Sequence, residues 1–174
     1  MKILAFAASS STKSINKILV TYATSLLDST DVDILDLNDF ELPLFSEDKE
    51  LELGKPELAK LFLAKIEEAD ALIISFAEHN ASYSTAYKNL FDWCSRINQK
   101  VFQNKPMILL ATSPGRGGGA NVLKTALNSI PHFGGIVKGS YSLPKFYDNF
   151  DTNKNEISNP KMALEFKNIV SSLE

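Results

Sequence analysis

Four hydroxyl residues in a row, residues 9–12, separate an apolar run from a stretch of helical periodicity. The run at residues 3–8 predicts a buried strand, and the apolar spacing that begins at Ile15 predicts a helix. The free N–H groups of a helix N-terminus and the helix dipole favour negative charge. Residues 6–16 are therefore interpreted as a phosphate cradle. An ordinary capped helix after an edge strand is the alternative.

Two further loops have the composition of a binding site. Residues 77–83 (Ala-Glu-His-Asn-Ala-Ser-Tyr) supply amides, hydroxyls and an aromatic-sized ring. Residues 113–119 (Ser-Pro-Gly-Arg-Gly-Gly-Gly) contain glycines that let the backbone approach a ligand closely. A ligand with a phosphate at one end and a flat heterocycle at the other would suit the three loops, and FMN is such a ligand.

Alternating strands and helices must position these loops. Strands are expected at residues 3–8, 32–37, 70–76, 106–112 and 135–143. Helices are expected at 14–27, from Pro56, at 84–99, at 120–130 and, with Asn159 as cap and Pro160 first, to about residue 173. Residues 28–31 should break the first helix, and 38–55 and 144–158 should be irregular, the former with at most a short helical turn.

This alternation predicts an α/β fold, a three-layer flavodoxin-like doubly wound fold. Its five-stranded parallel sheet should have the order 2-1-3-4-5. The order reverses between the first and third strands, so the loops after strands one, three and four should meet at one edge of the sheet. Residues 1–174 are expected to form a single flavodoxin-like domain.

The bulk composition excludes several classes of function. A net charge of -3 argues against nucleic acid as the main partner. The one cysteine, Cys94, excludes a disulfide framework and a multi-cysteine zinc site, and no residue set has metal spacing. Because no apolar run approaches the roughly 20 residues that span a bilayer, the protein is expected to be cytoplasmic, with no membrane partner.

At these loops the chain resembles the NAD(P)H-dependent FMN reductases, which include quinone, chromate and azo reductases. The family's Gly-Ser-x-Arg-x-x-Ser-x-Asn-x-x-Leu motif aligns with residues 8–19. Its Pro-Glu-Tyr-Asn-x-Ser motif aligns with residues 77–82, and Leu-Lys-Asn-x-x-Asp-Trp with residues 87–93. Its Ser-x-Gly-x-x-Gly-Gly loop aligns with residues 113–119, and residues 42–45 resemble its acidic-loop segment.

The resemblance implies an FMN site made of three sets of residues. The phosphate would be held by Ser9, Ser11, Ser14, Ile15 and Asn16. The isoalloxazine would be lined by Ala77, Glu78, His79, Asn80 and Ser82. The other edge of the ring and the ribityl chain would contact Ser113, Pro114, Gly115 and Gly118.

The resemblance also implies the chemistry. NADPH or NADH would pass a hydride to N5 of the flavin, and a small-molecule electron acceptor would take the electrons, so no catalytic side chain is expected. Family members assemble as homodimers or homotetramers, with the helix at residues 84–99 near the interface. A flavodoxin-type electron carrier is the alternative, although its usual Thr-x-Thr-Gly-x-Thr loop is absent. A protein-binding domain whose cleft is unused is a second, weaker alternative.

The departures from the family motifs concern single positions. Ser11 stands where the family has arginine, which leaves Lys13 as a substitute phosphate partner. Ala77 and His79 replace the family's proline and tyrosine. Several roles stay open at this stage. Glu78 either contacts the ligand or pairs with Lys88, and Asp92 and Trp93 either pack or form a subunit interface. The late loop contains three aromatic residues that form either a lid over the flavin or a surface anchor, namely Phe146, Tyr147 and Phe150.

Overall fold

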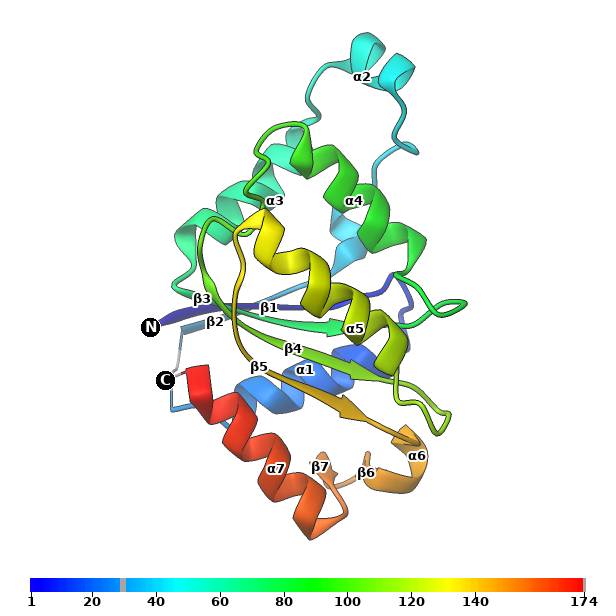
Figure 1. The fold of residues 1–174 in the computed structure, drawn as a ribbon, viewed down its shortest axis with the longest axis vertical. Helices are drawn as coiled ribbons and strands as arrows, with labels where there is room; N and C mark the ends of the chain where they lie inside the picture. Colours follow the sequence, from blue (N-terminus) through cyan, green and yellow to red (C-terminus); the bar gives the residue numbers. More distant parts are fainter. Residues whose placement is uncertain (29–30, 174) are drawn as a thin grey trace.

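The computed structural model describes residues 1–28 and 31–173, in which a five-stranded sheet lies between two layers of helices (Figure 1). The strands are β1 (Lys2–Ala8), β2 (Asp31–Leu35), β3 (Ala71–Phe76), β4 (Pro106–Thr112) and β5 (Ile136–Leu143). They pair in the order β2-β1-β3-β4-β5, and every pairing is parallel. The predicted three-layer flavodoxin-like fold is therefore confirmed.

Helices cover both faces of the sheet, and its central strands are almost entirely apolar, as expected for strands buried on both sides. Helices α1 (Ile15–Ser25) and α7 (Pro160–Val170) cover one face, and α3 (Glu57–Glu68), α4 (Thr85–Ser95) and α5 (Ala120–Ser129) cover the other (Figure 1). Each face has its own cluster of fully buried side chains, with Trp93 on one side and Phe166 on the other. In the described part of the chain, none of the helices is long and apolar enough to cross a membrane.

Side-chain caps fix where the helices around the candidate site begin. The hydroxyl of Ser14 accepts a hydrogen bond from the backbone N–H of Lys17, and the hydroxyl of Ser84 accepts one from Tyr87. Asn159 caps α7 and Pro160 is its first residue, as predicted. The expectation for Pro56 is wrong by one residue, because Pro56 has an extended backbone and α3 begins at Glu57. Helix α4 ends at Ser95, four residues before the predicted 99.

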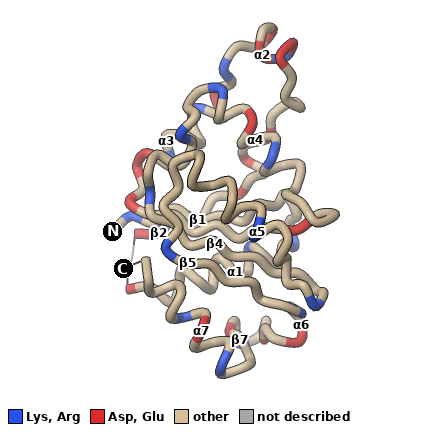
Figure 2. The backbone as a smooth tube through the Cα atoms, viewed as in Figure 1, with Lys and Arg blue, Asp and Glu red and all other residues tan. Residues whose placement is uncertain are grey.

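The segment between β2 and α3 is more regular than predicted. It contains a 3₁₀ helix, η1 (Leu37–Phe40), and helix α2 (Glu47–Leu53), which projects from the rest of the molecule (Figure 1). Three carboxylates in the first turn of α2 complement its dipole, and they stand out as the acidic tip in Figure 2. No residue of α2 is buried, so its helical form depends on the Ser46 cap and local charge.

The segment after β5 is also ordered, which corrects the expectation of an irregular loop. It contains α6 (Phe146–Asn149) and a small hairpin of β6 (Phe150–Asp151) and β7 (Glu156–Ile157). The rings of Phe146 and Phe150 stack with centroids 4.9 Å apart, and both are buried. The remaining elements are η2 (Ile130–Phe133) and η3 (Ser171–Leu173). The predicted helix break at residues 28–31 includes residues 29 and 30, which lie outside the described residues.

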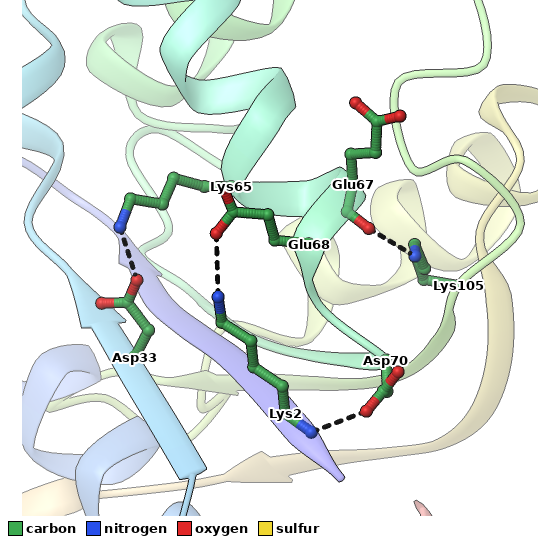
Figure 3. A network of polar contacts seen from close by, with 7 residues as sticks. All are labelled: Lys2, Asp33, Lys65, Glu67, Glu68, Asp70 and Lys105. Atoms are coloured by element: carbon green, nitrogen blue, oxygen red, sulfur yellow. Dashed lines mark hydrogen bonds and ion pairs between the residues drawn. The ribbon is translucent and has the colours of Figure 1, made fainter.

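The amino-terminal edge of the sheet is closed by charged pairs (Figure 3). The ammonium of Lys2 lies 2.8 Å from Glu68 and holds the pKa of that carboxyl below its usual range, while the backbone N–H of Lys2 donates to Asp70. Lys65 pairs with Asp33 at 2.9 Å. Exposed pairs contribute only about 0–1 kcal/mol each, so these pairs add little to the stability of the sheet.

Cys94 gives a test of how tightly α4 packs on α3. Its thiol is buried and donates to the carbonyl of Ala59 at 3.7 Å, and burial raises its pKa to about 12 from an ordinary value of 9.0. We expect a chromogenic disulfide reagent to leave the folded protein unlabelled at about pH 8 and to label it at once in denaturant. Between those two pKa values only the unfolded thiol ionises, so the free energy of unfolding should fall as the pH rises above 9. Rapid labelling of the native protein would contradict this packing.

Candidate functional site

The three loops singled out in the sequence meet at the carboxyl-terminal edge of the sheet. They enclose a cavity of about 230 Å³, which we call the cradle cavity. Most of the predicted site residues line it, namely Ser9, Ser11, Ser14, Ile15, Asn16, Ala77, Glu78, His79, Ser113 and Pro114. Lys13, Thr112 and Tyr147 complete the lining. Asn80, Ser82, Gly115 and Gly118 are not among the lining residues.

The first loop presents hydrogen-bond donors to the cradle cavity. The hydroxyl oxygen of Ser9 accepts from the N–H of Ser11 at 3.2 Å, and that of Ser14 accepts from Lys17 at 3.3 Å. Each oxygen is thereby engaged as an acceptor, which leaves its hydrogen free to point at an anion. The first N–H groups of α1, at Ile15 and Asn16, have no partner within the helix. This arrangement suits a phosphate group.

Lys13 lies at the cradle cavity, near the position where the family motif has an arginine. It is exposed and lines the cradle cavity. Lys17, the next lysine along the chain, is held 2.6 Å from Asp36 in an ion pair. Among the described residues lining the cavity, Lys13 is therefore the cationic group, and a flexible lysine replaces the rigid fork of an arginine.

Asn16 has a structural partner for each end of its side chain. Its Oδ1 accepts from the hydroxyl of Ser75 at 2.8 Å and from the N–H of Thr112 at 3.1 Å, and its Nδ2 donates to the carbonyl of Thr112 at 3.2 Å. All three residues are buried. The side chain thus joins the start of α1 to the ends of β3 and β4. Thr112 was not predicted as a site residue. Its position as the last residue of β4, at the edge where the loops meet, is the signal that could have identified it.

The loop after β3 contains a tight turn. The backbones of His79 and Ser82 exchange two hydrogen bonds, at 2.9 and 3.0 Å. The two residues between them, Asn80 and Ala81, both have positive φ, 50° and 63°. Positive φ at both central positions is typical of a type I′ turn. The turn directs Ala77, Glu78 and His79 to the cradle cavity and carries Asn80 and Ser82 away from it.

The turn is strained at Ala81, which gives a stability prediction. An alanine in the left-handed region costs about 1 kcal/mol relative to glycine. We expect Ala81→Gly to raise the free energy of unfolding by about 0.5 kcal/mol once the greater freedom of glycine in the unfolded chain is counted. Urea denaturation measures the difference. Ala64→Gly in the middle of α3 is the control and should lower stability by about 1 kcal/mol; destabilisation by both variants would argue against the positive φ.

Glu78 has a structural role, but with a different partner from the one expected. Its carboxylate accepts from the N–H of Val122 at 2.9 Å and from Asn121 at 3.4 Å, in the first turn of α5. Unpaired N–H groups at a helix start attract a carboxylate. The pairing with Lys88 is wrong, because Lys88 lies 2.7 Å from Asp92 on its own helix. Glu78 therefore fixes the loop after β3 against α5 while it lines the cradle cavity.

Gly118 in the third loop permits a close approach of the backbone to β5. Gly118 has φ +57°, and a Cβ there would lie 2.6 Å from the hydroxyl of Ser142 and 2.8 Å from the backbone nitrogen of Pro144. Ser142 donates to the carbonyls of Gly117 and Gly118 from the end of β5. Gly118 thus lets the loop pack on β5, which in turn places Ser113 and Pro114 at the cavity.

Residues 87–93 on α4, which align with the family's Leu-Lys-Asn-x-x-Asp-Trp motif, hold the segment at residues 42–45. The Asn89 side chain accepts from the N–H of Phe45 at 2.8 Å and donates to the carbonyls of Leu42 and Pro43. The indole N–H of Trp93 donates to Pro43 at 2.8 Å, and Trp93 is buried. Trp93 is therefore a packing residue. The motif at residues 87–93 and the segment at residues 42–45 are in direct contact.

The aromatic residues after β5 do not form a lid together. Phe146 and Phe150 are buried in the core beneath α6 and β6. Tyr147 alone of the three lines the cradle cavity, with 68% of its surface exposed. The lid prediction is wrong for the two phenylalanines, because their stacked rings are buried in the core, where they anchor this segment.

The fold and the cradle together define a flavodoxin-like protein with a hydroxyl-rich loop after its first strand. A family model described as NADPH-dependent FMN reductase matches residues 1–148, and the chain belongs to that family. FMN and a nicotinamide nucleotide are the cofactors of the family. The donors around the cradle cavity fit the phosphate of FMN, so the residues present suit the cofactor.

Individual relatives agree with this assignment. The chain is 39% identical to an NAD(P)H-dependent FMN reductase of Pseudomonas aeruginosa over 45% of this chain and 42% of the relative. It is 36% identical to a 2-hydroxy-1,4-benzoquinone reductase of a Burkholderia species over 69% of this chain and 64% of the relative. The alignments thus span about two fifths and just under two thirds of these relatives.

A solved structure supports the fold. The flavoenzyme NAD(P)H:(acceptor) oxidoreductase FerB from Paracoccus denitrificans superimposes with a TM-score of 0.76. The alignment covers 99% of this chain and 94% of FerB at 24% identity. At that identity the likeness shows a shared fold.

Proposed function

We propose that this protein, as one domain of residues 1–174, is an FMN-containing oxidoreductase acting in the cytoplasm. It takes a hydride from NADH or NADPH and passes the electrons to a small acceptor such as a quinone, an azo compound, a metal oxyanion or free flavin. The observation that supports the proposal is the cradle cavity, which Ser9, Ser14 and the start of α1 line together.

The residues of the chain bind and orient, and the cofactor carries the reaction. Bound FMN supplies a ring nitrogen, N5, that accepts hydride from a nicotinamide. The hydroxyls of Ser9, Ser11 and Ser14 and the first N–H groups of α1 hold its phosphate. Residues 77–79 and 113–114 line the same cavity and orient the remainder of the cofactor.

An absorbance titration tests the proposal directly. We expect FMN to bind at a one-to-one ratio with perturbed flavin bands, and the bands to bleach when NADH or NADPH is added without oxygen. Binding without bleaching by either nucleotide would favour the flavodoxin-type electron carrier. No perturbation at concentrations well above a Kd of about 1 μM would overturn the FMN site and leave a protein-binding domain as the alternative.

Lys13 gives a prediction specific to this chain. A charge-assisted bond to phosphate is worth about 1.5–3 kcal/mol, and solvent exposure reduces that value, so we expect Lys13→Ala to weaken FMN binding about tenfold. Fluorescence quenching of the flavin measures the Kd. Riboflavin lacks the phosphate and should bind both forms equally, and Lys124→Ala, an exposed lysine on α5 outside the cavity, should leave FMN affinity unchanged. An equal loss for riboflavin would assign Lys13 a different role.

We also propose a homodimer or homotetramer with α4 near its interface. A groove of about 210 Å³ between α4 and the end of α5 supports this, because apolar side chains dominate its lining, among them Tyr83, Tyr87, Phe91, Ile130 and Phe133. Sedimentation equilibrium of the native protein and of Phe91→Glu tests it. A monomeric native protein, or an oligomer that Phe91→Glu leaves intact, would contradict the placement.

A further inference from the structure

A second cavity lies on the other side of the first loop. Its volume is about 390 Å³, larger than that of the cradle cavity, and we call it the outer cavity. Ser10 lines the outer cavity, whereas its neighbours Ser9 and Ser11 line the cradle cavity. One short stretch of chain therefore borders both cavities. The rest of the lining comes from the segment after β2 and the first turns of α4, namely Leu37, Asn38, Phe40, Glu41, Leu42, Leu44, Thr85, Ala86 and Asn89.

The walls of the outer cavity are held by the core. Leu37 and Phe40 are buried members of the cluster beneath α3 and α4, so they form a fixed apolar floor. Phe40 packs edge-on against Phe62 of α3, with ring centroids 5.3 Å apart. The Asn89 side chain uses both hydrogens of its Nδ2 and one acceptor position of its Oδ1 in hydrogen bonds with residues 42–45, and these bonds keep that wall in place. The cavity is thus built into the fold, and a flat ring can lie on its floor.

The polar groups at the rim favour a ligand without negative charge. Glu41 is exposed and is the one charged side chain among the described lining residues. The amide nitrogen of Asn38 donates to Asp36 at 2.7 Å, which leaves the Asn38 carbonyl oxygen as an acceptor. The nearby Lys17 is already paired with Asp36. A carboxylate and an amide oxygen accept hydrogen bonds from ribose hydroxyls and amino groups, and they repel phosphate.

We infer that the outer cavity binds the adenosine end of the nicotinamide dinucleotide and selects NADH over NADPH. This inference rests on the proposed function. The dinucleotide is the reactant that carries a second ring system beyond its reacting end, whereas a quinone ends at the ring that reacts. The 2′-phosphate of NADPH would bring about -1.5 to -2 charge to the neighbourhood of Glu41. Glu41 is therefore a specificity-determining residue for the hydride donor.

Binding of nucleoside fragments to the FMN-saturated protein tests the cavity without relying on activity. We expect adenosine to bind in an NMR titration and adenosine 2′-phosphate to bind at least about tenfold more weakly. Glu41→Lys should reverse that order. Glu47→Lys makes the same charge change on α2, outside the cavity, and should leave both affinities unchanged. Equal binding of the two fragments, or an equal response of the two variants, would overturn the inference.

Flavin reduction by whole and truncated donors tests the link to the reaction. Ala86→Trp fills the outer cavity from the first turn of α4 and should lower kcat/KM for NADH at least about tenfold. It should leave reduced nicotinamide mononucleotide, which lacks the adenosine, unaffected. Glu41→Lys should raise the ratio of kcat/KM for NADPH to that for NADH at least about tenfold.

The possible outcomes distinguish a failure of the inferred adenosine site from a failure of the proposed reductase function. If Ala86→Trp slows the mononucleotide as much as NADH, the outer cavity does not hold adenosine. If none of the three donors reduces bound flavin, the reductase function itself fails, and the donor specificity inferred from it fails as well. If all donors reduce it and the fragments do not bind, the reductase stands and the outer cavity is refuted.

Discussion

Replacing Gly118 with alanine is expected to lower the free energy of unfolding by about 3 kcal/mol and to weaken FMN binding at least tenfold. The new Cβ would lie 2.6 to 2.9 Å from atoms of Ser142, Leu143 and Pro144, and two of these are backbone atoms that cannot rotate away. A left-handed φ of +57° adds a further penalty. The loop would move off β5, and Ser113 and Pro114 would move with it. Urea denaturation and an FMN titration measure the two effects.

The neighbouring glycine provides the matched control. A Cβ at Gly117 meets no atom within 4 Å, so Gly117→Ala should change stability by less than about 0.5 kcal/mol. Removing the Ser142 hydroxyl should not rescue Gly118→Ala, because the contacts with Pro144 and Leu143 remain. Similar losses at positions 117 and 118 would mean that flexibility of the loop, and not close approach to β5, explains its glycines.

The second large effect is expected at Asn16. Asn16→Ala removes the partner of the buried N–H of Thr112 and of the Ser75 hydroxyl, and it leaves a small cavity. An orphaned buried group costs about 1–3 kcal/mol, so a total loss of about 4 kcal/mol in the free energy of unfolding is expected. FMN affinity should fall as well, because the first loop is no longer joined to the end of β4. Chemical denaturation and flavin titration of the same preparation give both values.

Asn128 serves as the control for this substitution. It is exposed on α5, so Asn128→Ala should be neutral within about 0.5 kcal/mol. Asn16→Asp keeps oxygens that can accept from Ser75 and Thr112, loses the Nδ2 donor to the Thr112 carbonyl and places negative charge beside the proposed phosphate site. We expect Asn16→Asp to lose more FMN affinity than its stability alone explains. A loss below about 1 kcal/mol for Asn16→Ala would show that Thr112 and Ser75 find other partners.

Much of the fold and the meeting of the three candidate loops followed from the sequence. The apolar run of β3 and the spacing of apolar residues in α1 are local signals. An element buried on one or both faces has a pattern of apolar residues that is visible within a short stretch of sequence. The meeting of three loops followed from strand order, since parallel strands bring their carboxyl ends to one edge. The ordered segment after β5 was missed because its stability comes from Phe146 and Phe150 packing into the core, which no local pattern shows.

The sequence by itself predicted the five strands of the main sheet, the helices that cover it, the family motifs and the hydroxyl-rich loop after β1, but it did not predict α6 or the β6–β7 hairpin. Only the tertiary structure decided which partner each polar side chain takes. Asn16 meets Thr112 across 96 positions, Glu78 meets Val122 across 44, and Asn89 meets Leu42 across 47. The physical reason is that apolar burial depends on residue type and spacing, whereas a hydrogen bond needs a donor and an acceptor within about 3 Å. That proximity is set by how the whole chain packs.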